Sequence, residues 1–214
     1  MKKYSYQALI SAILVLFMAV TFPAFSAGQK TLIIYFSQPE TVAPGDVDGF
    51  SGASVIEKNN QQMGSTEYLA TLIQQQTGGD LFRIETTTPY PREHQPLLDA
   101  AQKESRENAR PIIKTALPDL SGYQTIFVGY PIWWYKMPMV MYSLFEQNQF
   151  SGKTLIPFTS HGGSRFTGSI QEIKRLQPNA NVITQGLAVY RTEVADEQTI
   201  QQVKQWVNQL NMGY

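Results

Sequence analysis

The 214-residue chain lacks cysteine altogether, and it contains only two histidines. Without cysteine it can form no disulfide, thiolate metal site, iron–sulfur cluster or thiol nucleophile, and it cannot carry a lipid on cysteine. An excess of charge of either sign is also missing, since 17 Lys and Arg balance 17 Asp and Glu. A chain without a basic excess has no electrostatic surface for nucleic acid, so we expect no nucleic-acid partner.

The longest hydrophobic run stands at the N-terminus, and it has the pattern of an export signal. Two lysines precede the apolar residues 8–20, and small residues suited to cleavage follow at 24 and 26. A membrane-spanning helix needs about 20 apolar residues, so this run favours a signal peptide over residues 1–26 rather than an anchor. We therefore expect a mature, periplasmic or secreted domain of residues 27–214 without a membrane anchor. Cleavage removes two lysines and leaves 15 basic against 17 acidic side chains.

Buried strands alternate with amphipathic helices along the rest of the chain. Apolar runs predict strands at 31–36, 125–130, 154–159 and, more weakly, 182–189, and an alternating pattern predicts an edge strand at 80–85. The spacing of apolar residues predicts helices over 66–77, 94–108, 138–147 and 169–176, and a last helix that Asp196 caps and that reaches Leu210. This alternation predicts an α/β fold, a three-layer α/β/α domain around a parallel sheet.

The connection between the first strand and the first helix is unusually long. Loops of this kind commonly have about 2–6 residues, whereas the segment 37–64 is polar and contains several prolines and glycines. Loops of this length are functional or mobile. The segment is therefore an insertion relative to an ordinary loop, and its sequence does not indicate its role.

Ligands of open parallel sheets bind beyond the carboxyl ends of the strands, and unusual residues follow three of these ends. The first site consists of Ser37, which directly follows the first strand, and of Gly64, Ser65 and Thr66, which open the next helix. Backbone N–H groups at a helix start, with hydroxyls around them, form an anion site. The alternative is an ordinary N-cap made by Ser65 or Thr66.

Aromatic residues follow the second strand end. Exposed Trp and Tyr side chains just beyond a strand are suited to stacking on a planar ligand, and the alternative is a hydrophobic interface patch. The residues at this end are Pro131, Ile132, Trp133, Trp134 and Tyr135.

The third strand end carries polar residues and a pair of glycines, which allow the backbone to approach a flat ligand closely. A hydrolase built on His161 is a further alternative, although no Gly-x-Ser-x-Gly elbow is present. His94 lies at the polar start of a helix, and we interpret it as a solvated residue. The residues at this third end are Thr159, Ser160, His161, Gly162, Gly163 and Ser164.

Together these loops resemble the flavodoxin family. The resemblance runs from Thr31 to about Leu210 and implies a five-stranded parallel sheet in the order 2-1-3-4-5 with bound FMN. Tyr90-Pro91, Ala101 and Glu104 are also similar to a branch of flavodoxin-like proteins that has a long insertion in the first loop. The motifs that carry the resemblance are Tyr35-Phe36-Ser37, Gly64-Ser65-Thr66-Glu67, Gly129 to Trp134, Met137-Pro138 and Pro157 to Ser164.

The resemblance also implies how the chain would hold FMN. Ser37, Ser65 and Thr66 would bind the phosphate, with Thr41 as an alternative to Thr66, and Gln38 and Gly64 would also belong to the cofactor-binding residues. Residues 131–135 would flank the isoalloxazine, with Trp133 or Trp134 stacking on it, and residues 159–164 would contact the ring edge. No metal and no catalytic side chain is implied.

Three functions are compatible with this sequence. The first is electron transfer by an exported FMN-binding protein to a redox partner protein. The second is an FMN-dependent NAD(P)H/quinone-type oxidoreductase with a small quinone-like acceptor, which the near-neutral charge favours because the small carriers of the family are strongly acidic. The third is a non-redox binding module, which the interrupted phosphate motif favours. In either redox function, Lys136 or Arg165 would raise the flavin potential by stabilising the reduced, anionic flavin.

Overall fold

The computed structural model describes residues 30–41, 54–58 and 61–210 of the chain. The predicted signal peptide and the middle of the long insertion lie outside these residues. No helix in the described ranges is long and apolar enough to cross a membrane.

A parallel sheet forms the centre of the fold. Its strands stand in the order β4-β1-β5-β6, and β7 and β8 both pair with the outer edge of β6. The predicted strands one to five correspond to β1, β4, β5, β6 and the pair of β7 and β8. In this numbering the order is 2-1-3-4-5, so the predicted topology is confirmed. The strands are β1 (Lys30–Phe36), β4 (Asp80–Ile84), β5 (Tyr123–Pro131), β6 (Thr154–His161), β7 (Asn181–Val182) and β8 (Leu187–Tyr190).

The fifth predicted strand is divided into β7 and β8, and Pro157 explains the division. Leu155 pairs with Val182 in β7, and Phe158 pairs with Leu187 in β8. The carbonyl of Leu155 accepts the N–H of the residue after Val182, so it faces the fifth strand. Residues two apart on a strand face the same side, so Pro157 faces it too, but proline has no N–H to donate. The ladder is therefore interrupted opposite this residue.

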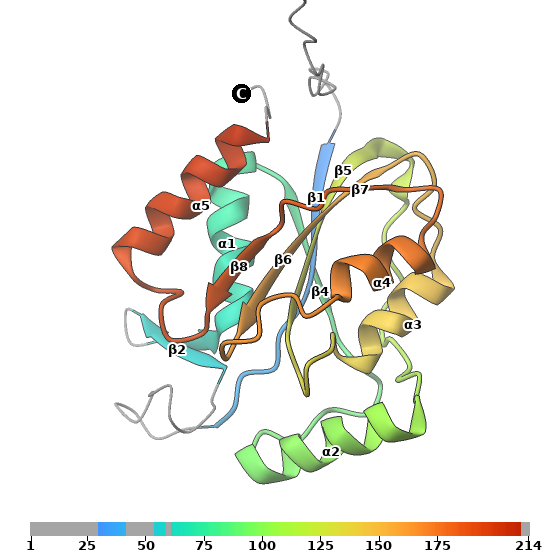
Figure 1. Ribbon diagram of the computed structural model, residues 1–214, viewed down its shortest axis with the longest axis vertical. Helices are drawn as coiled ribbons and strands as arrows, with labels where there is room; N and C mark the ends of the chain where they lie inside the picture. The colour runs from blue at the N-terminus through green and yellow to red at the C-terminus, as the bar shows by residue number, and fades with distance from the viewer. Residues whose placement is uncertain (1–29, 42–53, 59–60, 211–214) are drawn as a thin grey trace, which may run out of the picture.

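Helices cover both faces of the sheet (Figure 1), with α1 and α5 on one face and α3 and α4 on the other. The described helices begin and end within one residue of the ranges predicted for them, and Asp196 is the N-cap residue of α5, although its side chain makes no capping hydrogen bond. The helices are α1 (Ser65–Thr77), α2 (His94–Glu107), α3 (Met139–Gln147), α4 (Ser169–Leu176) and α5 (Glu197–Gln209), with a 3₁₀ turn η1 (Leu120–Gly122).

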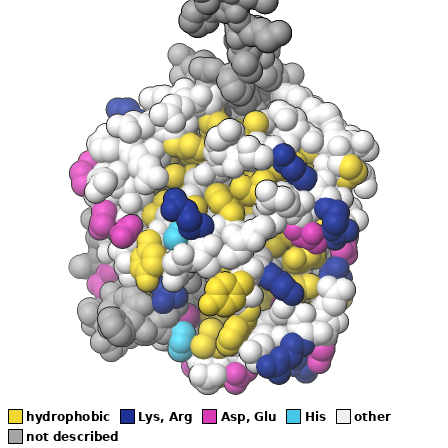
Figure 2. All heavy atoms as spheres, in the orientation of Figure 1, with side chains coloured by type: hydrophobic (Ala, Val, Ile, Leu, Met, Phe, Trp, Pro, Cys, Tyr) yellow, Lys and Arg dark blue, Asp and Glu magenta, His cyan; other side chains and the backbone are white. Residues whose placement is uncertain are grey.

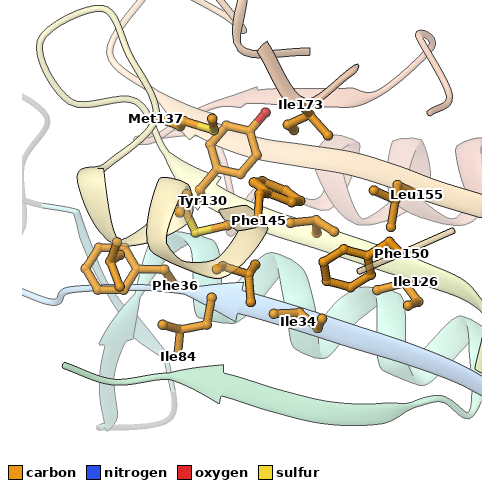
Figure 3. Packing of buried hydrophobic residues seen from close by; sticks show 14 of the residues in the cluster. Ile34, Phe36, Ile84, Ile126, Tyr130, Met137, Phe145, Phe150, Leu155 and Ile173 are labelled. Carbon is orange, nitrogen blue, oxygen red and sulfur yellow. The ribbon is translucent and has the colours of Figure 1, made fainter. Parts of the chain in front are cut away.

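Two hydrophobic cores hold these layers together. Along β1, Ile33 and Tyr35 pack in the core that α1 and α5 cover, whereas Leu32, Ile34 and Phe36 pack in the other. Figure 3 shows the second core, where side chains from the strands meet Phe145 of α3 and Ile173 of α4. This alternation buries both faces of the strand, as the unbroken apolar run predicts.

Helix α2 departs from the two layers. Figure 1 shows it beyond the carboxyl ends of the strands, below the helices that cover the faces. Its buried residues are Leu97 and Ala101, and Leu97 belongs to the core of α3 and α4. The helix therefore lies at the edge of the sheet where the sequence predicts a ligand.

Part of the long insertion is a β-hairpin, which the sequence did not predict. The strands β2 (Val55–Lys58) and β3 (Gln61–Gly64) pair antiparallel, and β3 leads directly into α1. Val55 and Ile56 are buried, and Ile56 packs in the core beside α1. Two apolar residues are too short a pattern to predict a strand from sequence.

Candidate functional site

The start of α1 brings together the hydroxyls that the sequence singles out. The Oγ of Ser37 accepts a hydrogen bond from the N–H of Glu67 at 3.3 Å. A Cβ at Gly64, the N-cap residue, would lie 1.9 Å from that Oγ, so glycine is required there. Ser65 is completely buried, and its Oγ has no hydrogen-bond partner in the structure. A helix start with a buried, unpaired hydroxyl is suited to an anion.

The insertion and the neighbouring strand both contact this helix start. The carbonyl of Ser54 accepts the N–H of Ser65 at 2.9 Å. The hydroxyls of Thr66 and Ser160 lie 2.7 Å apart and are both buried, which joins α1 to the end of β6. Thr41, the alternative to Thr66, is exposed and uses its N–H to bind the carbonyl of Arg92.

A cavity of about 460 Å³ lies beside the aromatic residues that follow β5. Its size suits a small-molecule ligand. The turn after β5, the glycine loop after β6 and the inner side of α2 line most of it, and the insertion and the end of β8 complete the wall. The lining residues are Ile132, Trp133, Trp134, Tyr135, Gly162, Gly163, Ser164, His94, Leu97, Leu98, Ala101, Glu40, Ser54 and Arg191.

A larger cavity, of about 700 Å³, opens on the β4 side of the helix start. Gln38 lines this cavity rather than the smaller one, and its amide nitrogen lies 3.4 Å from the carbonyl of Pro91. Ser37 belongs to its wall as well. Neither the aromatic turn nor the glycine loop reaches it, so we assign the planar ligand predicted from sequence to the smaller cavity.

Residues 133–136 form a tight turn with an unusual backbone. Trp133 and Lys136 exchange both backbone hydrogen bonds, at 2.9 and 3.0 Å, while Trp134 and Tyr135 between them have φ of 47° and 61°. Such turns favour Asn and Gly, because a side chain costs about 1–2 kcal/mol in this region. The indole N–H of Trp134 donates to the carbonyl of Leu98, and Thr167 donates to that of Tyr135. The first bond fixes the ring of Trp134 and the second fixes the backbone at Tyr135, and both residues line the cavity with exposed rings.

The strain in this turn can be measured at Tyr135, whose side chain is 75% exposed. Tyr135→Gly removes both the ring and the left-handed strain, whereas Tyr135→Ala removes the ring alone. We expect Tyr135→Gly to have a free energy of unfolding about 1 kcal/mol higher than Tyr135→Ala in urea denaturation. Equal stability of the two variants would show that the turn is not strained.

The two tryptophans of the turn differ in their surroundings. Trp133 is half-buried and packs edge-to-face against Phe36 and Tyr90, with ring centroids 5.3 Å apart in both pairs. The hydroxyl of Tyr90 donates to Glu104 at 2.8 Å, and burial followed by the charge of Glu104 raises the pKa of Tyr90. Trp133 is thus anchored in the core beneath the cavity, and Trp134 is the exposed ring of the pair.

The loop after β6 is shaped mainly by its own backbone. Thr159 is buried and its hydroxyl donates to the carbonyl of Tyr130 at 2.6 Å, which ties β6 to β5 beside Pro131. The Nδ1 of His161 accepts the N–H of Gly163, whose φ of 118° favours glycine. Burial and the nearby Arg165 lower the pKa of His161, so its imidazole is neutral at neutral pH.

Comparison with known proteins identifies the family. A sequence model described as flavodoxin matches residues 50–210. The chain belongs to the flavodoxin family. The comparison with curated proteins returned no match.

Solved structures have a similar fold. A flavoprotein from Bacteroides eggerthii is 23% identical over 85% of this chain and 98% of its own, with a TM-score of 0.60. One from Bacteroides uniformis is 24% identical over 85% and 99%, with a TM-score of 0.61. A flavoprotein in complex with FMN from Lactobacillus acidophilus is 19% identical over 78% and 96%, with a TM-score of 0.54. At these identities the likeness concerns the fold.

The side chain of His94 is 42% exposed, in agreement with its interpretation as a solvated residue, but it also has a partner that the sequence did not indicate. It lines the cavity from the first turn of α2, and its Nδ1 lies 2.9 Å from the Oε2 of Glu40. The side chain of Glu40 is only 5% exposed. Sequence reasoning missed both residues, because a loop carboxylate and a helix-start histidine 54 positions apart carry no common motif. Only the place of α2 across the strand ends brings them to the cavity.

Two basic residues flank the cavity without lining it. Lys136 closes the aromatic turn and Arg165 follows the glycine loop, and both are exposed. Figure 2 shows Lys and Arg side chains beside the hydrophobic side chains on this face. The two residues thus stand where the sequence places them, next to the two loops of the site.

Proposed function

We propose that this protein binds FMN at the start of α1 and in the 460 Å³ cavity, and that it acts in electron transfer. The unpaired Oγ of Ser65, buried at a helix start, is the observation that carries the proposal. An orphaned hydroxyl there costs stability unless a ligand completes its hydrogen bonding. Membership of the family and the FMN complex of the Lactobacillus flavoprotein support FMN as the cofactor.

Each end of FMN has its own group of residues in this proposal. The helix start, with hydroxyls and N–H groups, holds the phosphate through Ser37, Gly64, Ser65 and Thr66, and Ser160 supports Thr66. The exposed rings of the turn lie at one side of the isoalloxazine, and Gly162, Gly163 and Ser164 lie at the other. Bound FMN supplies one- and two-electron chemistry, and the protein tunes it through stacking and nearby charge. Pro131, Thr159 and His161 position these loops.

We propose further that the protein functions outside the cytoplasm, after removal of residues 1–26. The charged start, apolar run and small residues of that segment support export. Protein recovered after export should therefore begin at Ala27, and it should be yellow or become so with FMN. A different N-terminus contradicts the cleavage site, and a failure to quench FMN fluorescence contradicts the cofactor.

Ser65→Ala tests the phosphate site in the same protein. The variant removes a hydroxyl that lacks a partner, so the free energy of unfolding without FMN should stay the same or rise. Its affinity for FMN should fall about 10- to 100-fold, since a hydrogen bond to a charged group contributes about 1.5–3 kcal/mol. Fluorescence titration and urea denaturation measure the two effects.

Ser143→Ala is the matched control for this variant. The Oγ of Ser143 is also buried without a partner, but it lies in α3. Its removal should have the same effect on stability and leave FMN affinity unchanged. If Ser65→Ala and Ser143→Ala bind FMN equally well, the phosphate does not contact Ser65.

A reductase with a small quinone-like acceptor is the second candidate. The observation that favours it is the ionisable pair of Glu40 and His94 in the wall of the cavity, because a carrier that passes only electrons needs no such pair. The near-neutral charge of the mature chain also favours a small acceptor over docking to a charged partner.

A further inference from the structure

The pair of His94 and Glu40 defines which ring nitrogen of His94 carries a proton. The Nδ1 lies 2.9 Å from the Oε2 of Glu40, and an ionised carboxylate only accepts hydrogen bonds. Nδ1 is therefore the donor, and Nε2 is the second ring nitrogen of a residue that lines the cavity. A histidine oriented by a carboxylate in this way can take up and release a proton at Nε2.

The environment of the pair is asymmetric. Glu40 is almost fully buried, whereas the side chain of His94 is 42% exposed, so its proton can exchange with water. Arg191 lines the same cavity. On α2 itself Glu93 precedes the histidine and is exposed, and Asp99 accepts a hydrogen bond from Gln95. Glu40 is therefore the carboxylate that orients His94.

The other histidine of the chain has the opposite arrangement. The Nδ1 of His161 accepts the N–H of Gly163 at 2.9 Å, so its proton lies on Nε2. Burial and Arg165 keep it neutral. His161 thus shapes its loop, and His94 is left as the histidine suited to proton transfer.

We propose that His94 is a catalytic proton donor in the reduction of a small quinone-like acceptor, with Glu40 as its positioning residue. This rests on the proposed FMN site. Reduction of a quinone to a hydroquinone consumes two electrons and two protons. FMN, when bound and reduced, would supply the two electrons and one of the protons. The second proton would pass from Nε2 of the His94 imidazolium to a carbonyl oxygen of the acceptor, and a proton from the bulk solvent would then restore the imidazolium.

The tautomers provide a test that requires no turnover. Nitrogen-15 NMR of the imidazoles in the full chain, at mildly alkaline pH, should show His94 protonated at Nδ1 and His161 at Nε2. His94→Gln assigns the two sets of signals. Glu40→Ala should shift His94 toward the Nε2-protonated form and leave His161 unchanged. The proposal requires that, in neutral His94, Nε2 is unprotonated and can accept a proton. A wild-type His94 whose neutral form is protonated at Nε2 would therefore overturn it.

The reaction itself is tested with two oxidants. Protein loaded with FMN and reduced with dithionite is mixed in a stopped-flow instrument with a soluble naphthoquinone, or with ferricyanide, which takes electrons without protons. We expect His94→Gln to slow the reaction with the quinone about 100-fold or more and to flatten its dependence on pH. The reaction with ferricyanide should stay within about twofold of wild type, since general acid catalysis has no part in it.

Two further variants complete this test. Gln95→Ala, an exposed neighbour on α2, should match wild type with both oxidants. Glu40→Gln keeps an acceptor for the N–H of Nδ1 but loses the charge that stabilises the imidazolium, so it should slow only the reaction with the quinone. If His94→Gln does not bind FMN, Glu40→Gln takes its place in this test. Equal rates in wild type and His94→Gln, or equal slowing with both oxidants, would refute the role of His94. Wild type that does not bind FMN would refute the proposed function instead.

Discussion

Gly64→Ala is expected to lower the affinity for FMN about 10- to 100-fold or more, the loss that follows when one or more hydrogen bonds to a charged phosphate are broken. A Cβ at position 64 would lie 1.9 Å from the Oγ of Ser37 and 3.2 Å from its Cβ. Either Ser37 leaves the helix start or the first turn of α1 moves away from β1. In both cases the hydroxyls and N–H groups no longer converge on one anion. Fluorescence titration with FMN measures the loss.

Gly122→Ala is the control for this variant, because a Cβ there meets nothing within 4 Å and the residue lies away from the site. The double variant Ser37→Ala/Gly64→Ala separates shape from hydrogen bonding. It should recover stability relative to Gly64→Ala, since the clashing hydroxyl is gone, but it should not recover wild-type affinity. Affinity equal to wild type in Gly64→Ala would contradict the assignment of the phosphate to this helix start.

Gly129→Ala is expected to have the largest effect on stability, a loss of about 3 kcal/mol in the free energy of unfolding. The new Cβ would lie 2.1, 2.3 and 2.7 Å from three ring atoms of Phe158 on the neighbouring strand. That ring is fully buried, and a close-packed core leaves it no space to move into. Urea denaturation of the protein without FMN measures the change.

The cause of that loss can be checked by shortening the opposing side chain. Phe158→Leu alone should destabilise the protein, because it leaves a cavity in the core. In the Gly129→Ala background it should restore part of the stability, since the two changes compensate in volume. If the losses in the free energy of unfolding from Gly129→Ala and Phe158→Leu add in the double variant, the clash with Phe158 is not the reason why Gly129→Ala is destabilising.

The sequence by itself determined the order of the elements and the edge of the sheet that holds the site. Runs of apolar residues and helical spacing are local signals, and they place the helix ends within one residue. All parallel strands end at the same edge, so Ser37, the aromatic turn and the glycine loop had to come together there. The motifs Gly64-Ser65-Thr66 and Gly162-Gly163 could be recognised because their backbone requirements are also local.

The tertiary structure decided the features that depend on residues far apart in the chain. It divides the fifth strand opposite Pro157, and it separates Trp133, which packs in the core, from the exposed Trp134. It also joins Thr66 to Ser160 across the strand ends. Each of these depends on a partner that no pattern in the neighbouring residues identifies.

The position of α2 is the clearest case. Its pattern predicts a helix but not its place in the fold, and the structure lays it across the carboxyl ends of the strands (Figure 1). That position brings His94 to the cavity and to Glu40, a residue 54 positions earlier in the chain. The periodicity of apolar residues indicates which side of a helix is buried, but it does not identify the element against which that side packs. The pair of His94 and Glu40 could therefore be identified only from the tertiary structure.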